Sequence, residues 1–123
     1  MPMSTVPSGT NLAVLVGTLS REPELRSLAS GDTVLALEMT VRPEGAAAES
    51  VPIAWFAAPA CAASWAVGEE LLVIGRTRRR FFRAGGATQS RTEVVASAAF
   101  PTRRAAACRK ALGSALDALT AQL

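Results

Sequence analysis

The sequence predicts a small all-β barrel followed by one amphipathic helix. Three observations indicate this fold class: five segments have the residue pattern of strands, turn-forming residues separate them, and residues 101–123 change to a helical period. With 123 residues the chain is long enough for one core and too short for two. We therefore expect a flexible tail at residues 1–10, one barrel domain at 11–100 and a helix at 101–123.

The first three strands are expected at residues 11–20, 31–42 and 49–56. The first, NLAVLVGTLS, is aliphatic and β-branched with no helical period. The second, GDTVLALEMTVR, starts at a turn signal and then alternates between two faces, which is typical of a half-buried strand. The third, ESVPIAWF, contains Pro52, which indicates a sheet edge or a bulge.

A short helix and two further strands complete the barrel. After Pro59, ACAASWAVG predicts a helix of at most two turns that ends at Gly68. The fourth strand, at 69–83, is the longest. The Gly-rich stretch RAGGATQS turns the chain into the fifth strand at 91–100. Five strands with a helix between the third and fourth match an OB-fold, a five-stranded Greek-key barrel, although other small barrels can share this order.

The last segment has the pattern of an amphipathic helix, with Thr102 as its expected N-cap. Its leucine face can pack on its own barrel, pair with a second copy or dock a partner, and packing within an oligomer is the simplest reading. The face consists of Leu112, Leu116, Leu119 and Leu123.

Composition excludes several classes of chemistry. There is no histidine, so Ser/His/Asp and Cys/His catalytic arrangements are impossible, and a tetrahedral zinc site lacks ligands. We expect a protein that is not an enzyme and uses no cofactor and no metal. Cys61 and Cys108 are expected to be reduced and buried, with a disulfide between them as the alternative.

The amino-terminal residues MPMSTVPSGT lack the basic and apolar regions of a signal peptide. The long uncharged run at 51–67 falls short of the ~18 to 20 residues of a membrane helix and contains Pro52 and Pro59. A cytoplasmic protein with no membrane partner is therefore expected.

Charge is concentrated in GRTRRRFFR at 75–83, which holds five of the thirteen basic residues. Alternation along a strand places one row of cations and an aromatic ring on one face, at a pitch of about 6.6 to 6.8 Å. Such a row suits single-stranded nucleic acid, whose phosphates need cations and whose bases need flat apolar surfaces. The alternative is a solvated hairpin anchored by one of its phenylalanines. The row comprises Arg76, Arg78, Arg80 and Phe82.

A second aromatic candidate is Phe56, at the end of the third strand. It shares its face with Ala54, whereas Ile53 and Trp55 belong to the apolar face. We expect Trp55 in the core and Trp65 as an anchor of the short helix.

Several segments together resemble the bacterial single-stranded DNA-binding proteins. NLAVLVGTLSREPELR resembles their first strand and the following turn, with the pattern Gly17, Arg21, Pro23, Glu24 and Arg26. GDTVLALEMTV resembles the second strand, GEELLVIGRTRRRFF the fourth, and RTEVVA the fifth. The similarity spans residues 11–96 in the family's order and spacing.

This resemblance implies an OB-fold that assembles as a homotetramer or dimer and binds single-stranded DNA in replication, recombination and repair. Aromatic side chains would stack on bases and basic ones would contact phosphates. Matched to this sequence, the candidate DNA-binding residues are Arg76, Arg78, Arg80, Phe82, Phe56 and Arg83.

The sequence also departs from the family. Ser50 stands where an aromatic is common, Gly45 and Ala46 replace a loop tryptophan, and no acidic tip follows the helix, so recruitment of partners through such a tip is not expected. These departures keep an alternative open: an OB-fold assembly or replication-restart subunit, similar to primosomal replication protein B, that acts through protein–protein contacts.

Overall fold

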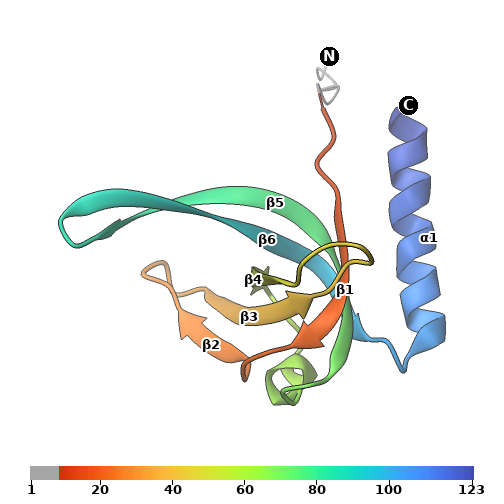
Figure 1. Cartoon of the computed structure of the whole chain (residues 1–123), viewed down its shortest axis with the longest axis horizontal. Coiled ribbons are helices and arrows are strands. Elements are labelled where there is room, and N and C mark those ends of the chain that lie inside the picture. Colours follow the sequence, from red (N-terminus) through yellow and green to blue (C-terminus); the bar gives the residue numbers. More distant parts are fainter. Residues whose placement is uncertain (1–8) are drawn as a thin grey trace.

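The computed structural model describes residues 9–123, and its strands form one six-stranded mixed sheet (Figure 1). The predicted tail therefore lies outside the described residues except for Gly9 and Thr10. The elements in chain order are β1 (Ala13–Leu19), β2 (Glu24–Ser27), β3 (Thr33–Val41), β4 (Glu49–Phe56), the 3-10 helix η1 (Ala60–Ser64), β5 (Glu70–Ala84), β6 (Ala87–Pro101) and the helix α1 (Ala105–Gln122).

Five of the six strands close into a ring. The sheet order is β1-β5-β6-β4-β3-β2, and β1 also pairs with β3 through Thr18 and Thr40. The pairing of β4 with β6 is parallel, at Ile53 with Val94 and at Ala54 with Val95, and the other pairings are antiparallel. The prediction of a mostly β barrel followed by a helix is confirmed, and η1 lies where the short helix was expected.

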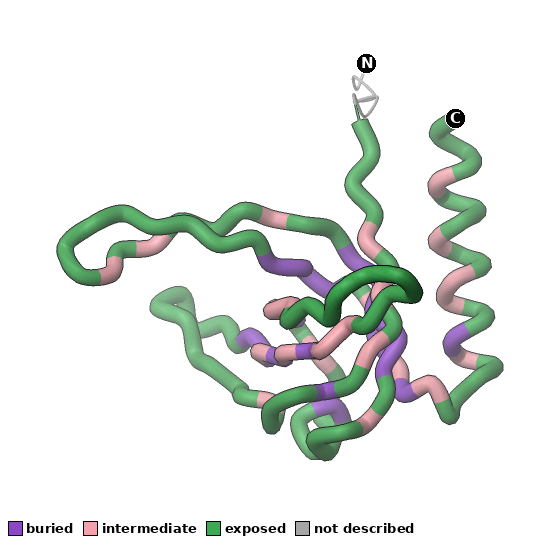
Figure 2. The backbone as a smooth tube through the Cα atoms, viewed as in Figure 1, coloured by how far each residue is buried: buried purple, intermediate pink, exposed green. Residues whose placement is uncertain are grey.

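The main core fills the interior of this ring. Alternate residues of β3 and β4 point inward, and Trp55 is buried with its ring centroid 5.8 Å from that of Trp65. Figure 2 shows the buried positions within the barrel and at the base of the arm, whereas the outer part of the arm is exposed or intermediate. The largest fully buried side chains are Leu19, Leu35, Met39, Leu71 and Val73.

A second, smaller cluster lies on the outer face of β5, beneath α1. Leu72 and Ile74 of β5 contact Cys108 of the helix, and the half-buried Ala111 and Leu112 extend this contact. Within this chain the predicted leucine face is therefore not the face that packs on the barrel, and its packing within an oligomer stays a prediction. In that stripe Leu112 contacts the barrel, whereas Leu116 is 54% exposed and Leu123 is 96% exposed.

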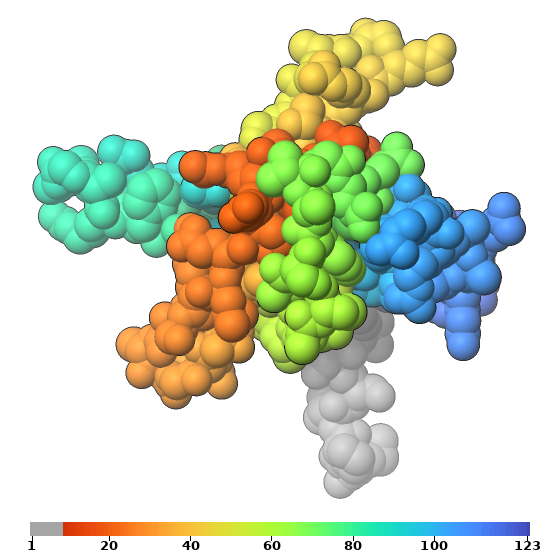
Figure 3. Space-filling model, turned by 90° about the horizontal axis from the view of Figure 1, so that it is seen from below, coloured from red at the N-terminus to blue at the C-terminus, as the bar shows by residue number. Residues whose placement is uncertain are grey.

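The hairpin of β5 and β6 is longer than predicted and forms a projecting arm (Figures 1 and 3). Its turn is only Gly85 and Gly86, with φ values of 58° and 80°. Two successive residues with positive φ match the twist of the flanking strands, so both strands continue to the turn. The predicted fifth strand is β6, which consequently begins at Ala87 instead of Arg91.

Three smaller expectations were wrong. The short helix ends at Ser64, and Gly68 instead donates its N–H to the carbonyl oxygen of Leu19 at 2.7 Å. The N-cap of α1 is Arg104, which makes no side-chain cap hydrogen bond, whereas the hydroxyl of Thr102, two residues earlier, donates to Oε1 of Glu70 at 2.6 Å. Both cysteines are free, but Cys61 is exposed while Cys108 is buried.

Within residues 9–123, neither helix has the length and apolar character needed to cross a bilayer.

Candidate nucleic-acid interface

An open groove lies on the outer face of the barrel, between the arm and the β2–β3 hairpin. Its volume is about 760 Å³, and β3, β4 and β6 form its floor. Figure 3 shows the arm and the β2–β3 turn projecting from the body as separate lobes. The side chains that line the groove come from five strands that are distant in sequence, so only the closed sheet assembles them.

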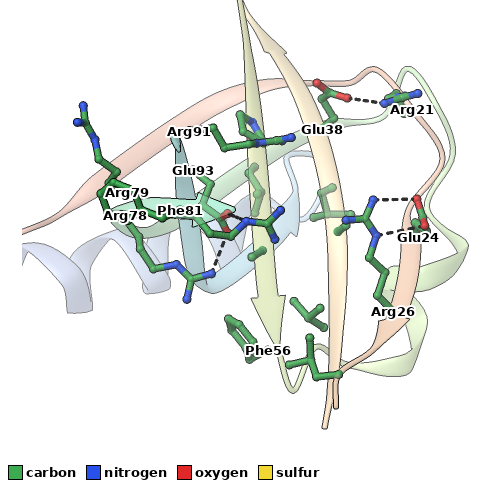
Figure 4. Close-up of a pocket in the computed structure, with 18 of the residues that line it drawn as sticks. Arg21, Glu24, Arg26, Glu38, Phe56, Arg78, Arg79, Phe81, Arg91 and Glu93 are labelled. Atoms are coloured by element: carbon green, nitrogen blue, oxygen red, sulfur yellow. Dashed lines mark hydrogen bonds and ion pairs between the residues drawn. The ribbon is translucent and has the colours of Figure 1, made fainter. Parts of the chain in front are cut away.

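Phe56 lies at one end of this groove (Figure 4). Its neighbours Ile53 and Trp55 are 3% and 6% exposed and point into the core, whereas Phe56 is 38% exposed. The predicted alternation is confirmed for this strand, because β4 keeps a regular register with β3 from Val41 opposite Glu49 to Val34 opposite Phe56.

Two arginines of the predicted row converge on one carboxylate. Nη2 of Arg78 lies 3.0 Å from Oε2 of Glu93, and Nε of Arg80 lies 3.5 Å from Oε1. Arg78 is directly opposite Glu93 in the β5–β6 pairing, so the bond crosses the two strands of the arm. Glu93 is 5% exposed, the side chain of Arg78 34% and that of Arg80 47%.

The same two arginines cover the two predicted stacking residues. The guanidinium carbon of Arg78 lies 5.6 Å from the ring centroid of Phe56, and that of Arg80 lies 5.7 Å from the centroid of Phe82. Such cation–π contacts hold a cation on the face of an aromatic ring. Each predicted aromatic residue is therefore paired with a predicted cationic one.

The other three predicted residues lie on the arm outside the groove lining. Arg76 is exposed, Phe82 is half-buried, and Nη2 of Arg83 donates to the carbonyl oxygen of Gly86 at 3.0 Å. Phe81 lines the groove instead and is 67% exposed. Side-chain alternation along β5 predicted Phe81 on the face opposite to Phe82 and the arginine row. In the twisted arm, however, residues from both faces of β5 line the groove.

The sequence did not predict the acidic residues of the groove. Glutamates from β2, β3, β6 and the turn after β1 lie among its arginines, so six cations face four anions. Their sequence separation hides this from inspection of the arm alone, whose residues 76–91 contain no acid. The lining arginines are Arg21, Arg26, Arg78, Arg79, Arg80 and Arg91, and the glutamates are Glu22, Glu24, Glu38 and Glu93.

Glu38 occupies the far end of the groove. Its carboxylate accepts hydrogen bonds from Ser50 Oγ at 2.9 Å and from Arg21 Nη1 at 3.2 Å. The Ser50 hydroxyl, and next Arg21, lower the pKa of Glu38 against the opposing effect of burial. Ser50, where the resemblance led us to look for an aromatic, thus serves as a hydrogen-bond donor.

No family model matches the sequence, and no curated protein matches it. Among solved structures, the wild-type single-stranded DNA-binding protein of Thermus aquaticus matches with a TM-score of 0.61 and 25% identity. The chain resembles a single-stranded DNA-binding protein.

The match covers 75% of this chain and 40% of the Thermus aquaticus chain, so this sequence spans less than half of that protein. The resemblance seen in the sequence motifs is confirmed at the level of fold. Within this fold the groove and the arm each present aromatic and cationic side chains together, and a third such pair, Arg104 over Phe100 at 5.5 Å, lies at the start of α1.

Proposed function

We propose that this chain binds single-stranded DNA without sequence preference, by stoichiometric binding and not by catalysis. The observation that carries the proposal is the exposed ring of Phe56 in an open groove, beside the arginine-rich arm of a fold similar to a single-stranded DNA-binding protein. A groove that combines cations with aromatic faces is the arrangement that sequence-tolerant single-strand binding requires.

In this proposal the DNA backbone follows the arm. Arg78, Arg80 and Arg91 would contact phosphates at the groove, and Arg76 and Arg83 would continue the track along β5. Bases would stack on Phe56 and on Phe82, each of which carries an arginine on one side of its ring. Phe81 joins this set because it is exposed in the groove.

Binding by one subunit is expected to be modest. Each stacked base contributes about 1 to 3 kcal/mol, and Ser50 supplies no ring at its position in β4. The mixed charge of the groove also leaves less attraction for phosphate than the arm sequence alone indicates. Several copies binding one strand would compensate for this.

We further propose a homo-oligomer, a tetramer or a dimer, acting in the cytoplasm in replication, recombination and repair. The outer face of β1 supports this, because Val14 is 43% exposed and Val16 is 51% exposed. Two apolar β-branched residues on one strand face are suited to contact with another protein surface.

The alternative function is an assembly or replication-restart subunit that acts mainly through protein contacts. The exposed Leu116 and Leu123 of α1 and the Glu93-bound arginines favour it. Under this alternative, substitutions of Leu116 and Leu123 would impair assembly with protein partners more than substitutions in the groove.

The first test is a binding titration with fluorescently labelled oligo-dT of about 35 nucleotides, longer than one OB-fold occupies, and with a duplex of equal length. The label belongs on the DNA, since Trp55 is buried and packs on Trp65 away from the groove. Anisotropy at two salt concentrations should show tight, salt-sensitive binding to the single strand and weaker binding to the duplex.

Phe56→Ala should weaken binding to oligo-dT by about fivefold to 150-fold, the equivalent of one stacked base. Val67→Ala is the matched control, because it truncates an exposed apolar side chain outside both the groove and the leucine face of α1. If Leu116→Ala abolishes assembly of the subunit with its protein partners while Phe56→Ala binds oligo-dT like the wild type, the assembly alternative replaces the DNA-binding proposal.

A further inference from the structure

Glu93 is the buried charged residue among residues 9–123. It lies in the arm strand β6 between Thr92 and the core residue Val94, with its side chain on the groove side. A carboxylate removed from water is costly unless its oxygens are paired. Here one oxygen faces Arg78 and the other faces Arg80, so this acid engages two arginines at once (Figure 4).

The two arginines are held differently. Arg78 lies against the floor of the groove over Phe56, and its Nε is buried without a hydrogen-bond partner within the described structure. Arg80 is more exposed and its distance to Glu93 is longer, 3.5 Å against 3.0 Å. Arg80 is therefore the arginine that an incoming phosphate can remove from Glu93 while Arg78 keeps the carboxylate paired.

Arg91 provides a contrast on the same surface. It lies directly opposite Arg80 in the β5–β6 pairing and lines the groove. No carboxylate of residues 9–123 lies within ion-pair distance of it. Arg91 interacts with Glu38 at longer range but forms no ion pair with it. A phosphate that binds Arg91 therefore breaks no ion pair, whereas one that binds Arg80 must compete with Glu93.

We propose that Glu93 is a positioning residue that holds Arg78 over Phe56 and competes with DNA phosphate for Arg80. It thereby limits both the affinity for single-stranded DNA and its dependence on salt. This inference rests on the DNA-binding function proposed above. The competition favours release of the strand, because the carboxylate recaptures Arg80 whenever a phosphate leaves.

Glu93→Gln tests the competition, since glutamine keeps the size and hydrogen-bonding capacity of the side chain and removes its charge. The variant should neutralise up to one more phosphate, so the log–log slope of affinity against salt should steepen by about 0.7. If the two proteins bind oligo-dT equally at 1 M salt, this slope gives the variant an affinity about eightfold higher than that of the wild type at 0.05 M salt and about threefold higher at 0.2 M.

Glu22→Gln is the matched control. Glu22 lines the same groove and is exposed, and it forms no ion pair within the described residues, so this change removes the same charge without freeing an arginine. Its salt slope should stay close to that of the wild type. If Glu93 had only a structural role, Glu93→Gln would lower the unfolding temperature without steepening the salt slope.

A second comparison leaves the buried acid in place, in case Glu93→Gln does not fold. In the wild-type background, Arg91→Ala should reduce the slope by about 0.7, and Arg80→Ala should reduce it by clearly less. Equal reductions for the two arginines, or a Glu93→Gln slope that matches the wild type, would overturn the role of Glu93 while leaving DNA binding established. Absence of oligo-dT binding by the wild-type chain would remove both proposals together.

Discussion

Gly75 lies at the base of the arm, where the backbone of β5 runs close to that of β6. The pairing register shifts there, from Ile74 opposite Ala98 to Gly75 opposite Ala96, so Ser97 is the extra residue of a β-bulge. A Cβ on Gly75 would lie 2.8 Å from the carbonyl carbon of Val95 and 2.9 Å from Cα of Ala96. Because these neighbours are backbone atoms, they cannot move aside as a side chain would.

Gly75→Ala should therefore destabilise the fold by about 1 to 3 kcal/mol, the usual cost of overpacking. Gly113→Ala is the control, since a methyl group added there, on the exposed face of α1, would have no neighbour within 4 Å. That change should stabilise the helix by up to about 1 kcal/mol. Urea unfolding of both variants checks the two signs, and a neutral Gly75→Ala would contradict the close approach.

At the scale of elements, α1 is joined to the barrel by a narrow contact. Its half-buried Leu112 and Ala115 flank the cluster of Leu72, Ile74 and Cys108, and Phe100 packs from β6. The helix beyond this point lies beside the amino-terminal segment, where Thr10 Oγ1 bonds Oε1 of Gln122 at 2.8 Å (Figure 1). The contact near Leu112 should thus account for most of the helix's attachment.

Leu112→Ala should lower the free energy of unfolding by about 1 to 2 kcal/mol, less than for a fully buried leucine because the site is half-exposed. Leu123→Ala should leave it unchanged, since Leu123 is 96% exposed. Thermal or urea unfolding of the two variants measures the difference. Equal losses would show that the leucine stripe is buried in solution, as it would be inside an oligomer.

At the scale of the whole molecule, Glu38 joins segments that are separate in the chain. Glu38 itself is in β3, near the pairing of β1 with β3 that closes the ring. Its carboxylate accepts hydrogen bonds from Arg21, which follows β1, and from Ser50 at the start of β4. Its pKa is lowered in the folded state, so it binds protons less readily there than in the unfolded chain. Its contribution to stability is therefore complete above its ordinary value of 4.5 and is lost as the pH falls through the lowered folded value.

Ser50→Ala should weaken this pH dependence, because the Ser50 hydroxyl is the main cause of the lowered pKa. Urea midpoints measured between about pH 5 and about pH 3 should fall less steeply for the variant than for the wild type. The comparison of the two proteins removes the contribution of other carboxylates, including Glu24, whose pKa Arg26 also lowers. Parallel pH profiles would show that Ser50 does not act on Glu38.

The barrel was predictable because its strands carry local signals. Alternation in β3 and β4 placed Trp55 inside and Phe56 outside, since successive side chains of a strand point to opposite faces. β2 was missed because all four of its residues are exposed, and only pairing with β3 makes the segment a strand. Within this chain the face of α1 that packs on the barrel consists mostly of alanine and Cys108, which a count of large apolar residues overlooks, and packing of the leucine face within an oligomer stays a prediction.

The sequence by itself determined the fold class, the placement of Phe56 on the groove side of β4, and the concentration of arginines on the longest strand. These follow from residue type and short-range periodicity, which act within a single element. Only the tertiary structure decided that Glu93 pairs with Arg78 and Arg80, that Phe81 lines the groove, and that four glutamates face its six arginines. Electrostatic pairing depends on distance in space, and the closed sheet brings together charges that lie far apart along the chain.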